Sequence, residues 1–392
     1  MEKVRLAELV ALVRGVSYKK EQASKNVKEG YTSILRANNI NDGAFNFDEL
    51  VFVPSDLVTS QQKISKNDIV ITMSSGSKAH VGKVAIAKMD MDSAFGAFCA
   101  KIIPQRIVPK YLFYILRSSD FRHHIETSCK GTNINNIKQE YILNYELLLP
   151  SVPEQERIVA RIEELFSQLD SGVETLKKTK EQLAVYRQAV LKEAFDITKV
   201  FVPFGKITES RLGKMLDKEK NTGVLQTYLR NINVRWFSFD LSDLLEMRIE
   251  PTETEKYSIE KGDLVICEGG EPGRCAVWEQ DEAIFYQKAL HRVRFINEAN
   301  PKFYMYYLWF AAQTGRLNPY FTGMGIKHLT GQSLARVPVL NTNIEQQNLV
   351  VQDIESKLSV CDSIEKTVDT ALQQAEAMRQ SILKKAFEGE LA

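Results

Sequence analysis

The sequence has few cysteines, and no two of them have the spacing of a metal-binding pair. The five stand at Cys99, Cys129, Cys267, Cys275 and Cys361, and none forms a Cys-x-x-Cys motif. An odd number in a chain of 392 residues disfavours a secreted, disulfide-linked framework. The spacing also disfavours a structural zinc site.

The sequence also lacks a long apolar run and a surplus of one charge. No stretch approaches the roughly 18–20 apolar residues of a membrane helix, and the first residues lack the apolar run of a signal peptide. Lys and Arg total 51 against 50 Asp and Glu, so the net charge of +1 indicates neither nucleic acid nor membrane binding. We expect a cytoplasmic protein, and the length predicts at least two globular domains.

What the sequence does contain is an internal repeat that spans nearly all of it. Pro109–Leu116 recurs as Pro301–Leu308, and Arg187–Phe195 recurs as Arg379–Phe387, both at an offset of 192 residues. Two copies are too few for a solenoid. The repeat therefore predicts a tandem duplication and a pseudo-two-fold molecule. A duplication without functional consequence is the alternative.

Each copy ends in a segment that predicts one long helix. Residues 154–195 contain a single glycine, Gly172, and no proline, and their apolar residues recur at steps of three or four with one step of seven, the pattern of one helical face. The second helix is expected to begin near Ile344 and to stop at Gly389. A helix of this length extends roughly 60 Å, too far to bury its apolar face on a small domain. We therefore expect the two helices to pair as an antiparallel coiled coil.

The segments that precede the helices mix strand and helix patterns. Apolar runs at residues 68–72 and 263–267 predict buried strands, each followed by a loop of small residues and a second strand. Prolines favour helices that start at Pro109 and Pro301. The predicted fold class is α/β, with two similar domains joined by the two long helices. The expected boundaries are residues 1–150 and 197–342 for the domains, and 151–196 and 343–392 for the helices.

The sequence shows no complete catalytic motif. Gly76–Val84 departs from the spacing of a phosphate-binding loop, and Asn318–Phe321 lacks the second proline of the adenine-methyltransferase motif. Asp353, Glu355 and Lys357 resemble a nuclease motif, but their spacing spreads them around the polar face of a helix. The five histidines form no metal-binding pattern. We therefore expect no catalytic residues, no metal site and no cofactor in this chain.

The ends of the two helical segments carry a family resemblance. Residues 150–159, followed by a helix ending in Arg187–Phe195, resemble the spacer of type I restriction-modification specificity subunits. Residues 345–350 and 381–391 resemble the second spacer and the usual C-terminus of that family. The resemblance covers essentially the whole chain, although Asn341–Ile344 replaces the proline-rich segment that leads into the first helix.

The resemblance implies a DNA-recognition scaffold for other enzymes. In that family, two target recognition domains each read one half of a split double-stranded DNA site, and the paired helices set the gap between the halves. The helices bind two methyltransferase subunits, and restriction/translocase subunits join them. S-adenosylmethionine, ATP and magnesium belong to those partners. Two alternatives are a self-sufficient DNA-modifying enzyme and a coiled-coil interaction protein without DNA binding.

Residues predicted to read DNA are polar and charged side chains in three loops of each domain, because such groups contact phosphates and base edges. In the first domain they are Arg36, Asn38, Asn39, Ser75, Lys78, His80, Lys83, Asn133, Asn135, Asn136 and Lys138. In the second domain they are Arg230, Asn231, Asn233, Arg235, Glu268, Arg274, Lys327 and His328. For each, a surface or turn residue without a DNA contact is the alternative.

Partner binding is expected on the outer faces of the two long helices. The candidates are Arg161, Phe166, Tyr186, Arg187, Phe195, Arg379 and Phe387. The aromatic residues among them could equally pack on the adjacent recognition domain.

Overall fold

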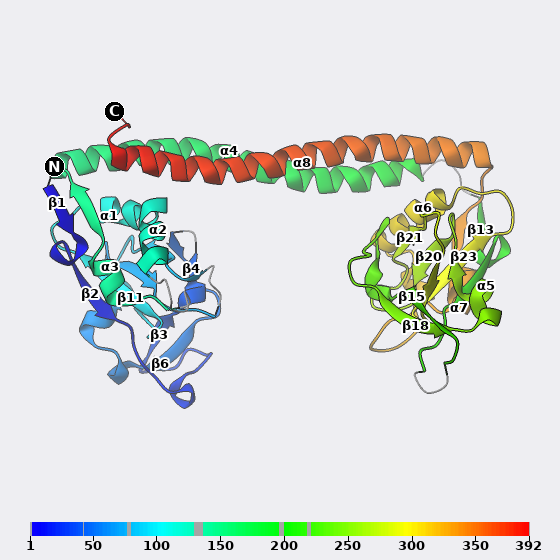
Figure 1. Cartoon of the computed structure of the whole chain (residues 1–392), viewed down its shortest axis with the longest axis horizontal. Helices are drawn as coiled ribbons and strands as arrows, with labels where there is room; N and C mark the ends of the chain where they lie inside the picture. Colours follow the sequence, from blue (N-terminus) through cyan, green and yellow to red (C-terminus); the bar gives the residue numbers. More distant parts are fainter. Residues whose placement is uncertain are drawn as a thin grey trace. The chain divides into compact units, whose positions relative to one another are not determined.

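The protein divides into two compact units, each built from a globular domain and parts of two long helices. The computed structural model describes residues 2–41, 43–76, 80–128, 136–195, 200–217 and 221–391. Unit 1 comprises Met1–Leu176 with Thr370–Ala392, and unit 2 comprises Lys177–Asp369. The long helices are α4 (Val152–Ala194) and α8 (Ile344–Glu388), and both contribute to each unit (Figure 1).

The domain of unit 1 contains two four-stranded sheets. One has the order β2-β11-β8-β9 and is antiparallel; the other has the order β6-β3-β10-β7, in which β10 runs parallel to β3. The strands are β1 (Glu2–Arg5), β2 (Val10–Arg14), β3 (Tyr31–Leu35), β4 (Ile40–Asn41), β5 (Ala44–Phe45), β6 (Val51–Pro54), β7 (Lys63–Ile64), β8 (Ile69–Thr72), β9 (Val84–Ile86), β10 (Met91–Phe95), β11 (Cys99–Pro104) and β12 (Glu146–Leu149). The helices are α1 (Pro109–Leu116), α2 (Ser119–Ser128) and α3 (Gln139–Leu143), with 3-10 turns η1 (Leu6–Glu8), η2 (Lys20–Gln22), η3 (Ala37–Asn39), η4 (Ser55–Leu57) and η5 (Ser60–Gln62).

Unit 2 repeats this topology strand for strand. Its sheets have the orders β14-β23-β20-β21 and β18-β15-β22-β19, and β22 runs parallel to β15. The strands are β13 (Phe201–Pro203), β14 (Thr208–Leu212), β15 (Val224–Leu229), β16 (Val234–Arg235), β17 (Ser238–Phe239), β18 (Leu245–Ile249), β19 (Ser258–Ile259), β20 (Leu264–Cys267), β21 (Cys275–Val277), β22 (Ile284–Tyr286), β23 (Leu290–Phe295) and β24 (Pro338–Leu340). The helices are α5 (Thr254–Tyr257), α6 (Pro301–Gln313) and α7 (Gly331–Arg336), with 3-10 turns η7 (Phe204–Lys206), η8 (Asn231–Asn233), η9 (Pro251–Glu253) and η10 (Asn318–Tyr320). The prediction of two similar α/β domains is confirmed.

The ends of the long helices belong to the cores of the two units. In unit 1, Ile162 of α4 and Leu383 of α8 are buried in one cluster with Leu112 of α1. In unit 2, Val190 of α4 and Ile354 of α8 are buried with α6 and the β14-β23-β20-β21 sheet. The apolar stripe that the sequence shows therefore has two partners: the other helix, and the neighbouring domain.

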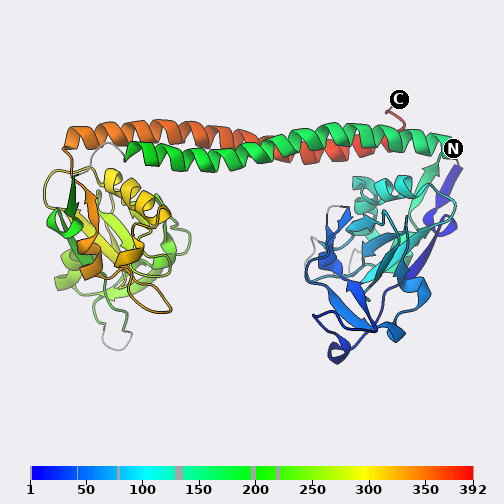
Figure 2. The same ribbon diagram turned by 180° about the vertical axis from the view of Figure 1, so that it is seen from behind.

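The two helices run antiparallel within each unit. In unit 2, the Lys180 ammonium lies 2.8 Å from the Asp369 carboxylate, and the Arg187 guanidinium lies 2.7 Å from the Asp362 carboxylate. Residue numbers thus rise along α4 as they fall along α8. In unit 1, the C-terminal end of α8 lies beside the start of α4 (Figure 2), and Arg379 forms an ion pair with Asp170. The predicted antiparallel pairing is confirmed.

Candidate functional site

The turn that follows β3 in unit 1 is rebuilt after β15 in unit 2 around a buried asparagine. Asn39 and Asn233 are 0% and 2% exposed. In each, the side-chain oxygen accepts a bond of 2.9 Å from the backbone nitrogen three residues earlier. The amide nitrogen donates to two backbone carbonyls of the following loop at 2.8–3.0 Å. Both amide ends are therefore used within the domain, and the predicted DNA contacts of these two residues are corrected to a loop-folding role.

The arginines of the same turn also bind the loop. The Arg36 guanidinium donates to the Glu49 carbonyl at 2.8 Å, and Arg230 donates to the carbonyl and the carboxylate of Asp243 at 2.7 Å. Both arginines are half-buried. Asn38, in the middle of this turn, is exposed, so it is the residue of the predicted trio that faces solvent.

Three loops of unit 2 meet around Arg274. Its guanidinium donates to the Asn231 side-chain oxygen at 2.8 Å and to the Glu271 carboxylate at 2.9 Å. The Asn231 amide donates to the Gly269 carbonyl at 2.5 Å, and the Trp236 indole donates to Glu271 at 2.7 Å. The structure therefore brings together Asn231 and Arg274, two of the residues predicted to read DNA, and pairs them with each other. No sequence pattern points to Trp236 and Glu271, because both stand in short turns without periodicity.

The remaining candidates of unit 2 surround this cluster. Lys327 and His328 are exposed, and Glu268 is half-buried. The backbone nitrogen of Leu329 donates to the Glu268 carbonyl at 2.7 Å, which joins the two loops. Arg235 is exposed on the β16–β17 hairpin, 3.4 Å from the Asp240 carboxylate.

In unit 1 the corresponding loops are only partly described. Lys78, Asn133 and Asn135 lie outside the described residues. Asn136 and Lys138 are exposed, and Lys138 lies 3.3 Å from the Glu140 carboxylate. Asn136 forms a backbone bridge with Ser74, so the loop before α3 meets the loop after β8. The other candidates in the β8–β9 loop, Ser75 and His80, are both half-buried.

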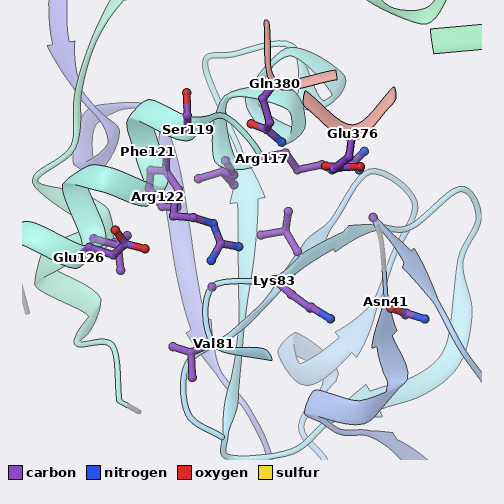
Figure 3. Close-up of a pocket in the computed structure, with 15 residues that line it drawn as sticks. Asn41, Val81, Lys83, Arg117, Ser119, Phe121, Arg122, Glu126, Glu376 and Gln380 are labelled. Atoms are coloured by element: carbon purple, nitrogen blue, oxygen red, sulfur yellow. The ribbon is translucent and has the colours of Figure 1, made fainter. Parts of the chain in front are cut away.

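The last candidate of unit 1, Lys83, lines a pocket of about 600 Å³ (Figure 3). Lys83 and Arg122 of α2 both extend their charged ends into it, and Glu126 and Glu376 lie at its wall. Among the described residues, neither Lys83 nor Arg122 has an ion pair. Arg122 was missed because the pattern of α2 is that of an ordinary surface helix. The pocket offers cations for a phosphate contact.

The two units differ at this position. Gly43 and Arg117 line the unit 1 pocket, and the topologically equivalent residues of unit 2 are Phe237 and Trp309. Their rings lie 5.7 Å apart between centroids. Unit 2 therefore places aromatic packing where unit 1 has a pocket with charged side chains.

Several candidates for partner binding lie inside the units. Phe166 and Phe195 are 6% and 5% exposed. Phe166 packs on Tyr114 of α1, and Phe195 packs on Phe303 of α6. Phe387 is half-buried against α1. The expectation of outer faces is wrong for these aromatics, because each packs a long helix against its adjacent domain.

The charged candidates on the helices mostly bridge the helix pair. Arg187 lies between Asp362 and Glu365 of α8, and Arg379 pairs with Asp170 of α4. Two candidates face solvent: Tyr186 is 49% exposed, and the Arg161 side chain, paired with its helical neighbour Glu164, is 44% exposed.

Within the described ranges, no group of three or more His, Cys, Asp or Glu side chains is placed to hold a metal ion. No helix in the same part of the chain has the length and apolar character required to cross a membrane.

A buried histidine of unit 2 should make stability depend on pH. His291 is 1% exposed, and its Nε2 donates to the Leu329 carbonyl at 2.9 Å. Burial lowers the pKa of His291 below its ordinary value of 6.5. The unfolded chain therefore binds a proton more readily than the folded chain, so stability is full above pH 6.5 and falls as pH drops toward the folded-state pKa.

We expect the free energy of unfolding to fall between about pH 7.5 and about pH 5.5 by less in His291→Gln than in the wild type. Urea titrations at the two pH values measure this difference. His123→Gln is the matched control, because His123 is exposed on α2. Equal pH dependence in the wild type and in His291→Gln would contradict the assignment.

The repeated two-sheet unit and the antiparallel helices define a duplicated scaffold protein, and comparison with known proteins identifies its family. Residues 1–184 match the model of the type I restriction modification DNA specificity domain. The chain is 32% identical to the specificity subunit of the type I restriction enzyme EcoKI from Escherichia coli strain K12, over 98% of this chain and 88% of that protein. The StySPI specificity subunit of Salmonella potsdam is 32% identical over the same shares. The chain therefore belongs to the family of type I restriction enzyme specificity subunits and is a DNA sequence-specificity subunit.

Solved structures show the same fold at low sequence identity. A chain solved in work on the assembly and conformational transition of a type I restriction-modification system has a TM-score of 0.77 at 16% identity, covering 99% of this chain and 98% of its own. The HsdS subunit from Thermoanaerobacter tengcongensis has a TM-score of 0.58 at 16% identity, covering 99% and 97%.

Proposed function

We propose that each unit reads one half of a bipartite double-stranded DNA site and that α4 and α8 set the gap between the halves. The observation that carries this proposal is the repetition of one two-sheet domain, with the same strand order but different side chains at its loops. A repeated scaffold supplies two readers, and different loops supply two sequences. The long helices join the readers because their ends are buried in the core of each unit.

The proposal includes the partners of the complex. Two methyltransferase subunits bind the helices, and restriction/translocase subunits join them to form the endonuclease. S-adenosylmethionine, ATP and magnesium act in those subunits, and this chain is a non-catalytic part of a DNA adenine methyltransferase and endonuclease complex. Because its substrate is chromosomal DNA, the complex acts in the cytoplasm. Exposed Tyr186 and Arg161 are the candidates for partner contact that the fold leaves available.

Lengthening both helices together should lengthen the unspecific gap in the DNA site. Four residues inserted between Leu176 and Lys177 of α4, with four more between Asp369 and Thr370 of α8, add about one helical turn to each helix. This is about 6 Å, so the gap is expected to grow by about one or two base pairs. Sequencing the methylated positions of DNA exposed to the assembled complex measures the gap.

The control inserts four residues into α4 alone. This displaces the ion pairs between the helices, such as Lys180 with Asp369, so we expect weaker DNA binding without a new gap. If the double insertion methylates DNA with the original gap, the helices do not set the spacing.

A further inference from the structure

The loop between α6 and α7 carries two exposed apolar side chains at its tip. Thr322 and His328 exchange two backbone hydrogen bonds of 2.8 Å, which close the loop at its base. Beyond this base, Met324 is 109% and Ile326 is 73% exposed. Neither side chain packs on unit 2, so their apolar character needs an explanation outside the unit.

The backbone of this loop is tightly folded. Gly323 has φ +98°, and a Cβ there would lie 2.3 Å from the Ile326 carbonyl oxygen, so glycine is required. Leu329, directly after the loop, is fully buried, and its nitrogen donates to the Glu268 carbonyl at 2.7 Å. The loop therefore presents Met324 and Ile326 from an anchored base.

The loop that carries the two apolar side chains has one cation and no acidic residue of its own. Lys327 and His328 are exposed, and residues 322–328 contain no acidic side chain. The Lys327 ammonium lies 5.9 Å from the centre of the Phe321 ring. A Cβ on Gly269 would lie 3.0 Å from the His328 Nδ1, so glycine permits the close approach of this loop to the cluster around Arg274. An apolar tip flanked by a cation suits the base stack and phosphates of DNA.

We propose that Met324 and Ile326 form an apolar wedge that enters a groove of the DNA half-site read by unit 2 and partly unstacks one base step. Lys327 contacts a neighbouring phosphate and holds the loop against the duplex. The energy of unstacking is offset by the contacts that the deformed DNA makes with the rest of the unit. This inference rests on the proposed reading of one half-site by each unit.

The test uses the full chain assembled with its methyltransferase partner. The assembled wild type first selects its preferred duplexes from a random-sequence pool. 2-Aminopurine, whose fluorescence rises on unstacking, is then placed at successive positions of the selected site. Base flipping by the methyltransferase raises the fluorescence at a target adenine in every variant. With the wild type we expect one further rise at a separate step of one half-site, and the Met324→Ala/Ile326→Ala variant should lose only this further rise. That variant should bind about tenfold more weakly.

Two further variants separate the parts of the loop. Lys327→Ala should keep the fluorescence rise while the salt slope of log K falls by about one, because one phosphate contact is lost. Met215→Ala is the matched control, since Met215 is 64% exposed on another loop of unit 2. It should keep the wild-type affinity and fluorescence.

Three results would contradict these proposals. A double variant that keeps the wild-type affinity and fluorescence shows that the tip does not enter the DNA. A double variant that loses the methyltransferase partner but keeps the DNA signal assigns the tip to a protein. A wild-type complex that enriches no split sequence would contradict the proposed function itself, which distinguishes that failure from failure of the wedge alone.

Discussion

Replacing Lys101 with alanine is expected to destabilise unit 1 by about 3–5 kcal/mol, because it leaves a buried carboxylate without its cation. Lys101 is 4% and Asp68 is 5% exposed. The Lys101 ammonium lies 2.8 Å from the Asp68 carboxylate and donates to the Lys63 carbonyl at 2.7 Å. Asp68 also accepts a bond from the Ser65 nitrogen at 2.8 Å. The pair therefore fixes the start of β8 against β7 and β11.

Urea unfolding, monitored by hydrogen exchange of the amides in unit 1, measures the free energy of unfolding. Lys63→Ala is the matched control, because the Lys63 side chain pairs with Asp92 in an exposed position and is expected to contribute no more than about 1 kcal/mol. Lys101→Met combined with Asp68→Leu should be much less destabilising than Lys101→Ala, since no charge remains buried. Equal losses in Lys101→Ala and Lys63→Ala would refute the buried pair as a determinant of stability.

Unit 2 has an equivalent buried carboxylate, but two arginines take the place of the single lysine. Asp263, 4% exposed, pairs with Arg294 at 2.7 Å. Arg292, in the strand position that matches Lys101, donates to the Ser258 carbonyl at 2.6 Å. The two units therefore neutralise an equivalent buried carboxylate with different residues. The stability of unit 2 need not depend on a single cation as that of unit 1 does.

Replacing Gln155 with alanine is expected to loosen α4 from the domain of unit 1 and to destabilise the unit by about 2–4 kcal/mol. The substitution leaves two buried backbone groups without their hydrogen-bond partner. Gln155 is 1% exposed. Its side-chain oxygen accepts from the Val108 nitrogen at 2.9 Å, and its nitrogen donates to the Pro150 carbonyl at 2.9 Å. These bonds tie the start of α4 to the residue that precedes α1.

Gln347 makes the equivalent connection in unit 2, so Gln347→Ala should behave alike. It is 2% exposed, accepts from the Asn300 nitrogen at 2.8 Å and donates to the Thr342 carbonyl at 2.9 Å. Because each glutamine fixes a domain on its helix, we also expect both variants to lose more affinity, relative to the wild type, for the bipartite site than for one isolated half-site.

Urea unfolding and DNA titration with both duplexes measure these losses. Gln168→Ala is the control, because Gln168 is exposed on α4 and should change stability by no more than about 0.5 kcal/mol. If Gln155→Ala unfolds and binds like Gln168→Ala, the buried glutamine is not the link between helix and domain.

Some candidate positions can be found in the sequence, and others cannot. Gly323 and Gly325 surround Met324 in a segment without strand or helix periodicity, which is a readable sign of an apolar loop tip. By contrast, nothing in the sequence distinguishes exposed Asn38 from buried Asn39. Their difference arises from hydrogen bonds to a loop several residues away. A polar residue that can contact DNA can also stabilise a turn, and only the fold shows which of the two its side chain is free to do.

The sequence by itself determined the duplication, the α/β class and the two paired helices, because a repeat and a helical periodicity can be read directly from the order of residues. Only the tertiary structure decided which side of each helix remains exposed to solvent and to partners. Phe166 and Phe195 satisfy the helical stripe equally well on an outer or an inner face, and they are buried because α1 and α6 lie against them. Burial depends on neighbours that are distant in sequence, so no local pattern specifies it.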